Sequence, residues 1–320
     1  MSEATAASAG QSSEVALPTG AQYEIQLGAM RATITEVGAG LRSFSVEGRE
    51  VLDTYGPREM PQSGRGQALL PWPGRIEDGR YVFNGTTYQT PLSEPPAHNA
   101  IHGLTRWANW RVASHEAHRL TMELTLHAQV GYPFVLLLQE HYTLTSRGLE
   151  VQTVARNIGA TPLPYGAGHH PYFTVGTESA NAAVLYVPAR SYFRVTERSL
   201  PIVPPVSVQG TPYDFRALHA IGETVLDIGY TDLIADADGW TRATISTPGG
   251  HPTITVFMDA AHQFIQVFTG DTLGDVARRR KGVAIEPYTC AANAFNNGYG
   301  LRALQPGASF ASVWGIAVTL

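Results

Sequence analysis

The chain has 320 residues, a formal net charge of −5 at pH 7 and a charged share of 15%. This mildly negative balance offers no electrostatic basis for binding nucleic acid or an anionic membrane surface, so we expect neither partner. The hydrophobic share of 43% is ordinary for a globular protein, and the 32 glycines and 21 prolines predict many turns between short segments.

Cysteine use and the N-terminal segment bear on the compartment. Cys290 is the only cysteine, so no intrachain disulfide can form, which fits a reducing environment. Met1–Thr5 lack the basic and apolar regions of a secretory signal, and no segment approaches the roughly 18 apolar residues that span a bilayer. We therefore expect a cytoplasmic protein. Residues 1–18 are small and polar, which predicts a disordered N-terminal tail before a single domain of residues 19–320.

From Tyr23 onward the hydrophobic period is two, the period of a half-buried strand. Arg119–His127 shows it best, with apolar and polar side chains in strict alternation. Asn84-Gly85 lies between two short β-prone runs and predicts a tight hairpin, because both residues tolerate positive φ. Further strands are expected at Thr241–Ser246, Thr253–Phe257, Phe264–Phe268 and Ser312–Leu320.

Helical signals are nearly absent. Arg216–Ala220 and Ala291–Phe295 are the best candidates for short helical turns, and there is no alternation of strands with helices and no internal repeat. The chain is therefore predicted to be all-β, as one large antiparallel β-sandwich with few short helices. Sandwiches of this kind bind ligands on a concave face, with residues from strand ends and long loops.

Two titratable residues far apart in sequence have settings suited to acid–base chemistry. His170 precedes Pro171, which holds it extended. In such a segment His169 points the other way, so only one of the two histidines faces a given pocket. Glu286 ends an apolar run, where loss of water would raise its pKa toward the range of a general base. Taken singly, His170 could equally be a hydrogen-bonded histidine at a strand end, and Glu286 a surface carboxylate at a strand exit.

A second histidine and the cysteine are weaker candidates. His102 precedes Gly103, which would let a ligand approach the backbone closely. His98 and His102 have a spacing that suits a metal only on a helix, and the residues between them form a poor one, so we expect no metal site. Cys290 has no identified activating partner and is interpreted as a packing residue.

Other residues could hold a hydroxyl-rich ligand. The Arg75 guanidinium could donate two hydrogen bonds to neighbouring hydroxyls, and Trp72 and Tyr172 offer aromatic surface for a sugar ring. Asp232 could accept hydrogen bonds from hydroxyls. The alternative for Arg75 is a structural pair with a nearby carboxylate such as Glu77 or Asp78.

These segments together resemble the aldose 1-epimerase (galactose mutarotase) family from about Gln22 to Leu320. Each segment is weak alone, and their order and spacing make the match specific. The segments that carry it are Pro71–Ile76, Asn99–Leu104, His170–Phe173, Thr231–Leu233, Thr269–Asp271, Ile285–Pro287 and Asn293–Asn296.

The resemblance implies a large antiparallel β-sandwich with an open sugar-binding groove and no metal or organic cofactor. It implies that Glu286 is the general base for the anomeric hydroxyl of a free hexose such as glucose or galactose. His170 would be the acid that protonates the ring oxygen, and His102 would orient the sugar near that oxygen. Arg75 and Asp232 would bind sugar hydroxyls. Because one group must be ionised and the other protonated, we expect a bell-shaped dependence of kcat/KM on pH.

One departure and two alternatives remain. The family usually has asparagine where this chain has Gly74, which leaves hydroxyl preference open. The run Arg278–Lys281, together with Arg106, would suit a hexose-6-phosphate 1-epimerase, although such a run is more often a solvated loop. A non-catalytic sugar-binding module is the other alternative, and it would need neither an acid nor a base. Oligomeric state is not indicated by the sequence.

Overall fold

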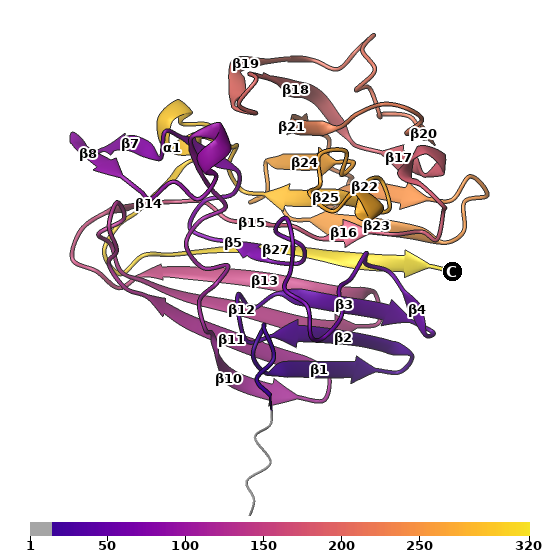
Figure 1. Ribbon diagram of the computed structural model, residues 1–320, viewed down its shortest axis with the longest axis horizontal. Helices are drawn as coiled ribbons and strands as arrows, with labels where there is room; N and C mark the ends of the chain where they lie inside the picture. The colour runs from indigo at the N-terminus through magenta and orange to yellow at the C-terminus, as the bar shows by residue number, and fades with distance from the viewer. Residues whose placement is uncertain (1–14) are drawn as a thin grey trace, which may run out of the picture.

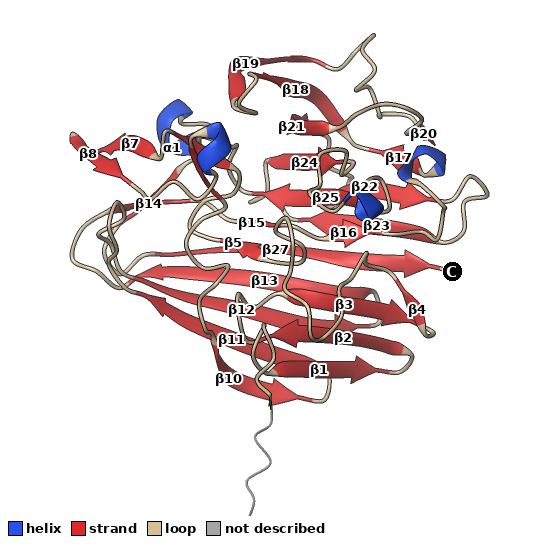
Figure 2. Cartoon of the chain, in the orientation of Figure 1, coloured by secondary structure: helices blue, strands red, loops and turns tan. Residues whose placement is uncertain are grey.

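The computed structural model describes residues 15–320, which form a largely antiparallel β-structure (Figures 1 and 2). Its largest sheet has nine strands. In sheet order they are β10 (Arg111–Glu116), β11 (Arg119–Leu126), β12 (Leu136–Thr145), β13 (Gly148–Asn157), β27 (Ser309–Thr319), β23 (Thr253–Met258), β22 (Thr241–Ser246), β17 (Val184–Tyr186) and β20 (His219–Ala220).

A second sheet of eight strands forms the upper part of the molecule in Figure 1. In order they are β19 (Pro201–Ser207), β18 (Ala189–Val195), β21 (Asp227–Leu233), β24 (Phe264–Phe268), β25 (Val283–Tyr288), β15 (Gly168–His169) and β5 (Ala68–Leu69), with β16 (Tyr172–Phe173) also paired to β25.

Smaller elements cover the two large sheets. A four-stranded sheet contacts β11 and β12 through its first strand. Its strands are β1 (Gln22–Leu27), β2 (Met30–Thr35), β3 (Leu41–Val46) and β4 (Arg49–Glu50). Three two-stranded ribbons pair β6 (Arg75–Glu77) with β9 (Asn99–Ile101), β7 (Arg80–Phe83) with β8 (Thr86–Gln89), and β14 (Leu163–Tyr165) with β26 (Arg302–Leu304). The helical elements are α1 (Ala294–Asn297) and the 3-10 turns η1 (Pro95–Ala97), η2 (Ala180–Ala182) and η3 (Val276–Arg278).

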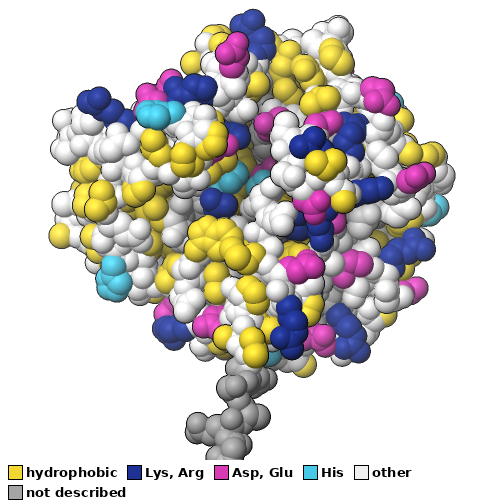
Figure 3. Space-filling model, in the orientation of Figure 1, with side chains coloured by type: hydrophobic (Ala, Val, Ile, Leu, Met, Phe, Trp, Pro, Cys, Tyr) yellow, Lys and Arg dark blue, Asp and Glu magenta, His cyan; other side chains and the backbone are white. Residues whose placement is uncertain are grey.

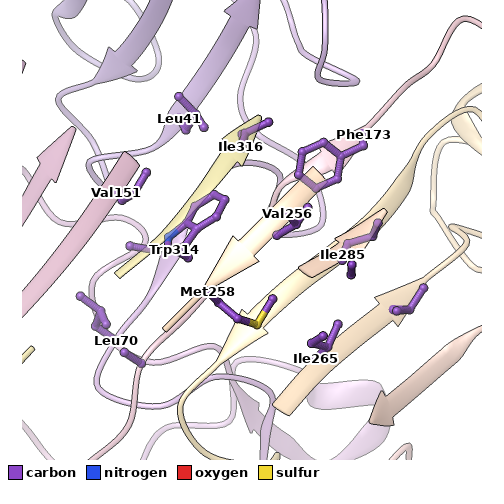
Figure 4. Packing of buried hydrophobic residues seen from close by; sticks show 14 of the residues in the cluster. Leu41, Leu70, Val151, Phe173, Val256, Met258, Ile265, Ile285, Trp314 and Ile316 are labelled. Carbon is purple, nitrogen blue, oxygen red and sulfur yellow. The ribbon is translucent and has the colours of Figure 1, made fainter. Parts of the chain in front are cut away.

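The hydrophobic core lies between the two large sheets (Figure 4). Val256 and Trp314 come from the nine-stranded sheet, and Ile265 and Ile285 come from the eight-stranded sheet. All four are at most 1% exposed. Because side chains of a strand alternate between its two faces, the residues next to Ile265 and Ile285 must point away from this core. That second face of the eight-stranded sheet is available for a ligand.

The structure confirms the all-β prediction and most of its details. The alternating run became β11, and Asn84 and Gly85 turn the β7–β8 hairpin at φ of 48° and 77°. The helical turn predicted at Arg216–Ala220 is wrong: Arg216 binds the carboxylate of Asp214 instead, and the last two residues form β20.

Two other expectations concern the second helical turn and the N-terminal tail. The predicted helical turn at Ala291–Phe295 overlaps α1, which begins three residues later, at Ala294. The predicted disordered tail, residues 1–18, lies largely outside the described residues, and the single domain of residues 19–320 stays a prediction. Within residues 15–320, no helix is long and apolar enough to cross a membrane.

Candidate active site

A cavity of about 350 Å³ lies over the outer face of the eight-stranded sheet. Side chains of β24 alternate between the cavity and the core. Gln266 points into the cavity, whereas its neighbours Ile265 and Val267 are fully buried in the core. Register then puts Glu286 opposite Gln266 on the same face. Figure 3 shows a hollow near the centre of one face of the molecule, where histidine, basic and acidic side chains meet.

Glu286 lies in the cavity wall on β25 and is only 1% exposed. The hydroxyl of Tyr288, two residues along the same strand face, donates a hydrogen bond of 2.5 Å to Glu286 Oε2. Burial raises the pKa of the Glu286 carboxyl well above its usual range, while the hydrogen bond from Tyr288 acts in the opposite direction. Glu286 is therefore a desolvated carboxyl with one fixed donor.

His170 lies beside Glu286 in the cavity wall, with 3.5 Å between His170 Nε2 and Glu286 Oε2. Its ring stacks on Tyr172 at 4.9 Å and an interplanar angle of 9°. On its edge, a Cβ at Gly64 would meet His170 Cδ2 at 2.7 Å, so the 62–67 loop must pass close to the imidazole. Burial, followed by the charges of Arg106 and Arg65, lowers the pKa of His170 to about 3.

Burial raises the pKa of Glu286 and lowers that of His170, so both neutral forms are favoured in the free protein: the imidazole carries no charge, and the carboxyl holds its proton. Moving it to His170 gives an ionised base and a protonated acid with no change in net charge. This interconversion makes the pair suitable for proton transfers on a neutral ligand.

His102 supplies a third polar group, fixed by the backbone of Gly74. The backbone N–H of Gly74 donates to the ring Nδ1 of His102 at 3.2 Å, and the backbone N–H of His102 donates to the Gly74 carbonyl at 2.8 Å. Since Nδ1 accepts, the proton of the neutral ring is on Nε2. Burial lowers the pKa of His102 well below its ordinary value, so the ring stays neutral. His102 is thus a hydrogen-bond donor in the cavity wall, edge-on to His170 at 5.3 Å between ring centroids.

The glycine at position 74 has a steric reason in this chain. Gly74 has φ +61°, and a Cβ there would lie 2.6 Å from the Cβ of Ala292. Asparagine tolerates such a φ, but it would still collide with this neighbour. The departure from the family pattern therefore coincides with close packing of the Gly74 backbone against Ala292, while the contact to His102 is made by the backbone itself.

We expect Gly74→Ala to lower the free energy of unfolding by about 2–4 kcal/mol, because left-handed strain and overpacking add. Gly28→Ala is the matched control: φ is +57°, and nothing lies within 4 Å of its added Cβ. It should cost only the strain, about 1 kcal/mol. Urea unfolding of both variants measures the difference. Equal losses would show that Ala292 yields at no cost.

Two clusters of hydrogen-bonding groups complete the wall. Arg75 binds Glu94 in a bidentate pair, with Nε–Oε2 of 2.8 Å and Nη2–Oε1 of 2.9 Å. Asp227 accepts a hydrogen bond of 2.7 Å from the Gln266 amide, and burial raises its pKa. Arg75 thus combines the two roles considered for it, because it lines the cavity and also has a carboxylate partner. That partner is neither Glu77 nor Asp78.

Two predicted sugar-binding residues lie elsewhere. Trp72 is 2% exposed and packs its ring against Tyr132 and Phe295 in the core, so it presents no face to the cavity. Asp232 is exposed near the end of β21 and is not part of the cavity wall. Asp227, the first residue of the same strand, lines the cavity instead. Tyr172 does line it, as the stacking partner of His170.

The remaining candidates have structural partners. His98 is an exposed residue paired with Asp78, and no group of three or more metal-ligating side chains occurs within residues 15–320. In the basic run, Arg278 binds Asp53 and Arg280 binds Asp271, whereas Arg279 and Lys281 are exposed. Burial raises the pKa of the Cys290 thiol to about 12, in keeping with a packing role.

Several cavity residues were missed by sequence reasoning. Tyr288 carries a usable signal, because it lies two residues from Glu286 on the same strand and so shares its face. Glu94, Asp227 and Gln266 carry none, since their place in the wall depends on strand pairing and on a loop packed against Arg75.

Comparisons with known proteins agree with this architecture. The sequence profile of the family described as aldose 1-epimerase matches residues 21–316. The chain is 34% identical to the Escherichia coli K12 protein YihR, described as uncharacterized, over 290 residues that cover 90% of both chains. It is 26% identical to an E. coli K12 aldose 1-epimerase over 167 residues, 50% of this chain and 47% of that protein.

Solved structures share the fold at lower identity. A GalM/aldose epimerase homologue from Caenorhabditis elegans superposes with a TM-score of 0.83 at 17% identity, covering 93% of this chain and 98% of that one. A galactose 1-epimerase from Lactobacillus acidophilus NCFM gives a TM-score of 0.74 at 20% identity, with coverage of 93% and 94%. With its profile match across most of the sequence and its similarity to YihR, the chain belongs to the aldose 1-epimerase family.

Proposed function

We propose that the protein is an aldose 1-epimerase that interconverts the α and β anomers of a free aldohexose such as glucose or galactose. The observation that carries the proposal is the neighbouring pair of Glu286 and His170, 3.5 Å apart in a cavity of about 350 Å³. A cavity of this size suits a small ligand such as a hexose. Family membership supports the same reaction class.

The mechanism needs only proton transfers. With the shared proton on His170, the Glu286 carboxylate takes the proton of the anomeric hydroxyl, and His170 protonates the ring oxygen as the C1–O5 bond breaks. The resulting open-chain aldehyde rotates about C1–C2 and recloses on its other face, with the two residues in reversed roles. His102 Nε2–H donates to the ring-oxygen region and orients the sugar. General acid–base catalysis of this kind contributes about 10²–10⁴-fold for each group.

Hydroxyl recognition falls to the polar wall on the Glu286 side. Arg75 keeps donors free after binding Glu94 through Nε and Nη2, and Asp227 and Gln266 form an acceptor–donor pair. These groups are fixed before the sugar arrives, which reduces the entropy cost of holding it in a reactive position.

The test is polarimetry on freshly dissolved α-D-glucose and α-D-galactose, repeated across pH. We expect mutarotation faster than in buffer. The active form carries one proton on the pair: it is lost at low pH when His170 and Glu286 are both protonated, and at high pH when neither is. Because the pKa of His170 is lowered to about 3, activity should persist at pH 5, and the raised pKa of Glu286 should set the falling alkaline limb.

A histidine titrating near its ordinary pKa of about 6.5 would instead give an acid limb between pH 6 and 7. That result would contradict the assigned environment of His170. No acceleration of any aldose would refute the proposed activity and favour a protein that binds sugar without turning it over.

A further inference from the structure

One side chain, that of Arg198, joins the connection between β18 and β19 to the segment around η1. Its guanidinium donates from Nε to the carbonyl of Ala97 at 2.9 Å and from Nη2 to the carbonyl of His98 at 2.8 Å. The same Nη2 lies 2.7 Å from Asp78 Oδ1 and 3.0 Å from Asn99 Oδ1. In return, the Asn99 amide donates to the carbonyl of Arg198 at 3.2 Å. These contacts, termed the Arg198 bridge, link two segments about 100 residues apart in sequence.

Both of the linked segments contribute to the cavity wall. The residues that line it are Val195, Ser199 and Pro201 on the β18–β19 side and Ser93, Glu94 and Ile101 on the η1–β9 side. Ser199 and His98 flank the bridge with φ of +54° and +55°, a left-handed conformation that persists only where surrounding contacts hold it. The bridge therefore fixes the two walls against each other and closes the cavity between them.

The bridge lies at the end of the cavity away from His102 and His170. Asn99 is the first residue of β9, and the chain runs from there toward His102, whose ring is edge-on to that of His170. At a rise of about 3.3 Å per residue, Asn99 and His102 are about 10 Å apart along this path. Asn99 also donates to Glu94 Oε2 at 3.3 Å, the carboxylate that binds Arg75. The bridge thus continues the hydroxyl-binding wall formed by Arg75 and Glu94.

The order of atoms in a pyranose shows which hydroxyls would meet this end. Under the proposed function, C1 lies at Glu286 and the ring oxygen lies at His170. Across the ring, C3 is opposite the ring oxygen and C4 is opposite C1. The 3- and 4-hydroxyls therefore point away from the acid–base pair, toward Arg75 and the bridge beyond it. The cavity of about 350 Å³ is near the lower end of the usual range for ligand sites, about 300–1,000 Å³, so it leaves little room for a second ring.

We propose that Arg198 determines specificity by closing the C3–C4 end of the cavity: the protein accepts a free monosaccharide and rejects a reducing disaccharide whose second sugar is on the 3- or 4-hydroxyl. This inference rests on the proposed epimerase activity. A second sugar would have to displace the guanidinium and leave Asp78 and two backbone carbonyls without their donor. Exclusion of this kind builds a clash against the wrong ligand and needs no new contact to the right one.

The test compares kcat/KM for D-glucose, lactose and laminaribiose, measured by NMR exchange between the anomers at equilibrium. The reacting ring is glucose in all three sugars, and it carries a 4-linked galactose in lactose and a 3-linked glucose in laminaribiose. Glucose should exceed each disaccharide by about 100-fold or more, because a fixed wall discriminates strongly against a group that clashes with it.

Arg198→Ala removes the bridge and should raise the lactose-to-glucose ratio of kcat/KM at least about tenfold, mainly by lowering KM for lactose. The ratio does not depend on the folded fraction, since both sugars are measured on one preparation. Arg198→Lys keeps a charge for Asp78 but loses the fork, so it should give a smaller rise. Arg216→Ala is the matched control: the Arg216 side chain is 34% exposed, against 35% for Arg198, and it pairs with Asp214 away from the cavity wall. Its ratio should equal that of the wild type.

The outcomes separate this inference from the proposed function. Wild-type turnover of lactose at the rate of glucose would overturn the closed end and leave the epimerase activity intact. A preference for glucose that is unchanged in Arg198→Ala would overturn the role of Arg198, since the backbone of the two walls would then exclude the second sugar. Absence of turnover with all three sugars would instead refute the proposed activity. Saturation-transfer NMR with glucose and lactose needs no turnover and would still show whether Arg198→Ala admits the disaccharide.

Discussion

Replacing Glu286 with glutamine is expected to lower kcat/KM by about 10³-fold for every sugar that the wild-type protein accepts. Glutamine keeps the size of the side chain and can still accept the hydrogen bond from Tyr288, but it cannot take a proton. The loss should appear mainly in kcat, because the group acts on the reacting atoms rather than on the rest of the sugar. Polarimetry with saturating sugar separates kcat from KM.

The stability of the Glu286→Gln variant should not fall together with its activity. A carboxyl with a raised pKa in the folded state holds its proton more tightly there, so it contributes less stability as the pH rises above about 4.5. The glutamine side chain has no such dependence. At pH 8 the variant should therefore be as stable as the wild type or more so, which excludes misfolding as the cause of its inactivity.

Glu50→Gln is the matched control for this variant. Burial raises the pKa of Glu50 as well, and its carboxylate accepts the backbone N–H of Phe44, but it lies in the four-stranded sheet and not in the cavity wall. Its activity should stay within about twofold of wild type. If Glu286→Gln also retained wild-type turnover, the proposed general base would be wrong.

The fold was largely predictable because strands and tight turns have recognisable patterns within a few neighbouring residues. The period-two run of β11 and the Asn84-Gly85 turn depend on a few neighbouring residues, and both formed as expected. The helical turn at Arg216–Ala220 failed because its local preference is weak. There the ion pair with Asp214 and strand pairing to β17 decide the backbone.

The site was predictable only where a residue has a local reason for its direction. His170 is held extended before Pro171, and Glu286 alternates with buried Ile285, so the face of each follows from its own strand. Asp232 is predicted from the family resemblance, and nothing in the sequence itself shows which end of β21 meets the cavity. That is fixed by its pairing with β24.

Trp72 shows the opposite problem. A tryptophan in a proline-rich loop beside Arg75 suits either a sugar platform or the core, and the two settings cannot be separated by local sequence. Its ring is buried by Tyr132 and Phe295, which lie far along the chain. Whether Trp72 is buried therefore depends on contacts with residues distant in sequence, which local sequence patterns do not reveal.

The second large effect separates two adjacent histidines. His170→Asn should lower kcat/KM by about 10²–10⁴-fold, because the amide N–H is far too weakly acidic to protonate the ring oxygen. Its effect on stability should be small, since within residues 15–320 the His170 Nδ1 has no hydrogen-bond partner to lose. Polarimetry and urea unfolding on the same preparations measure the two quantities.

His169→Asn should do the reverse. His169 points to the core side of the strand, where its Nε2 lies 3.2 Å from Glu140 Oε2 and its ring lies 5.1 Å from that of Trp314. Glu140 is fully buried and keeps the Thr153 hydroxyl as a donor, so losing the imidazole partner should cost about 1–3 kcal/mol of stability. Turnover by the folded fraction should be kept within a few-fold. The opposite pattern, with chemistry lost at His169 and stability lost at His170, would mean that the two faces of this strand have been exchanged. Alternation along one extended segment thus makes neighbouring residues serve catalysis and folding separately.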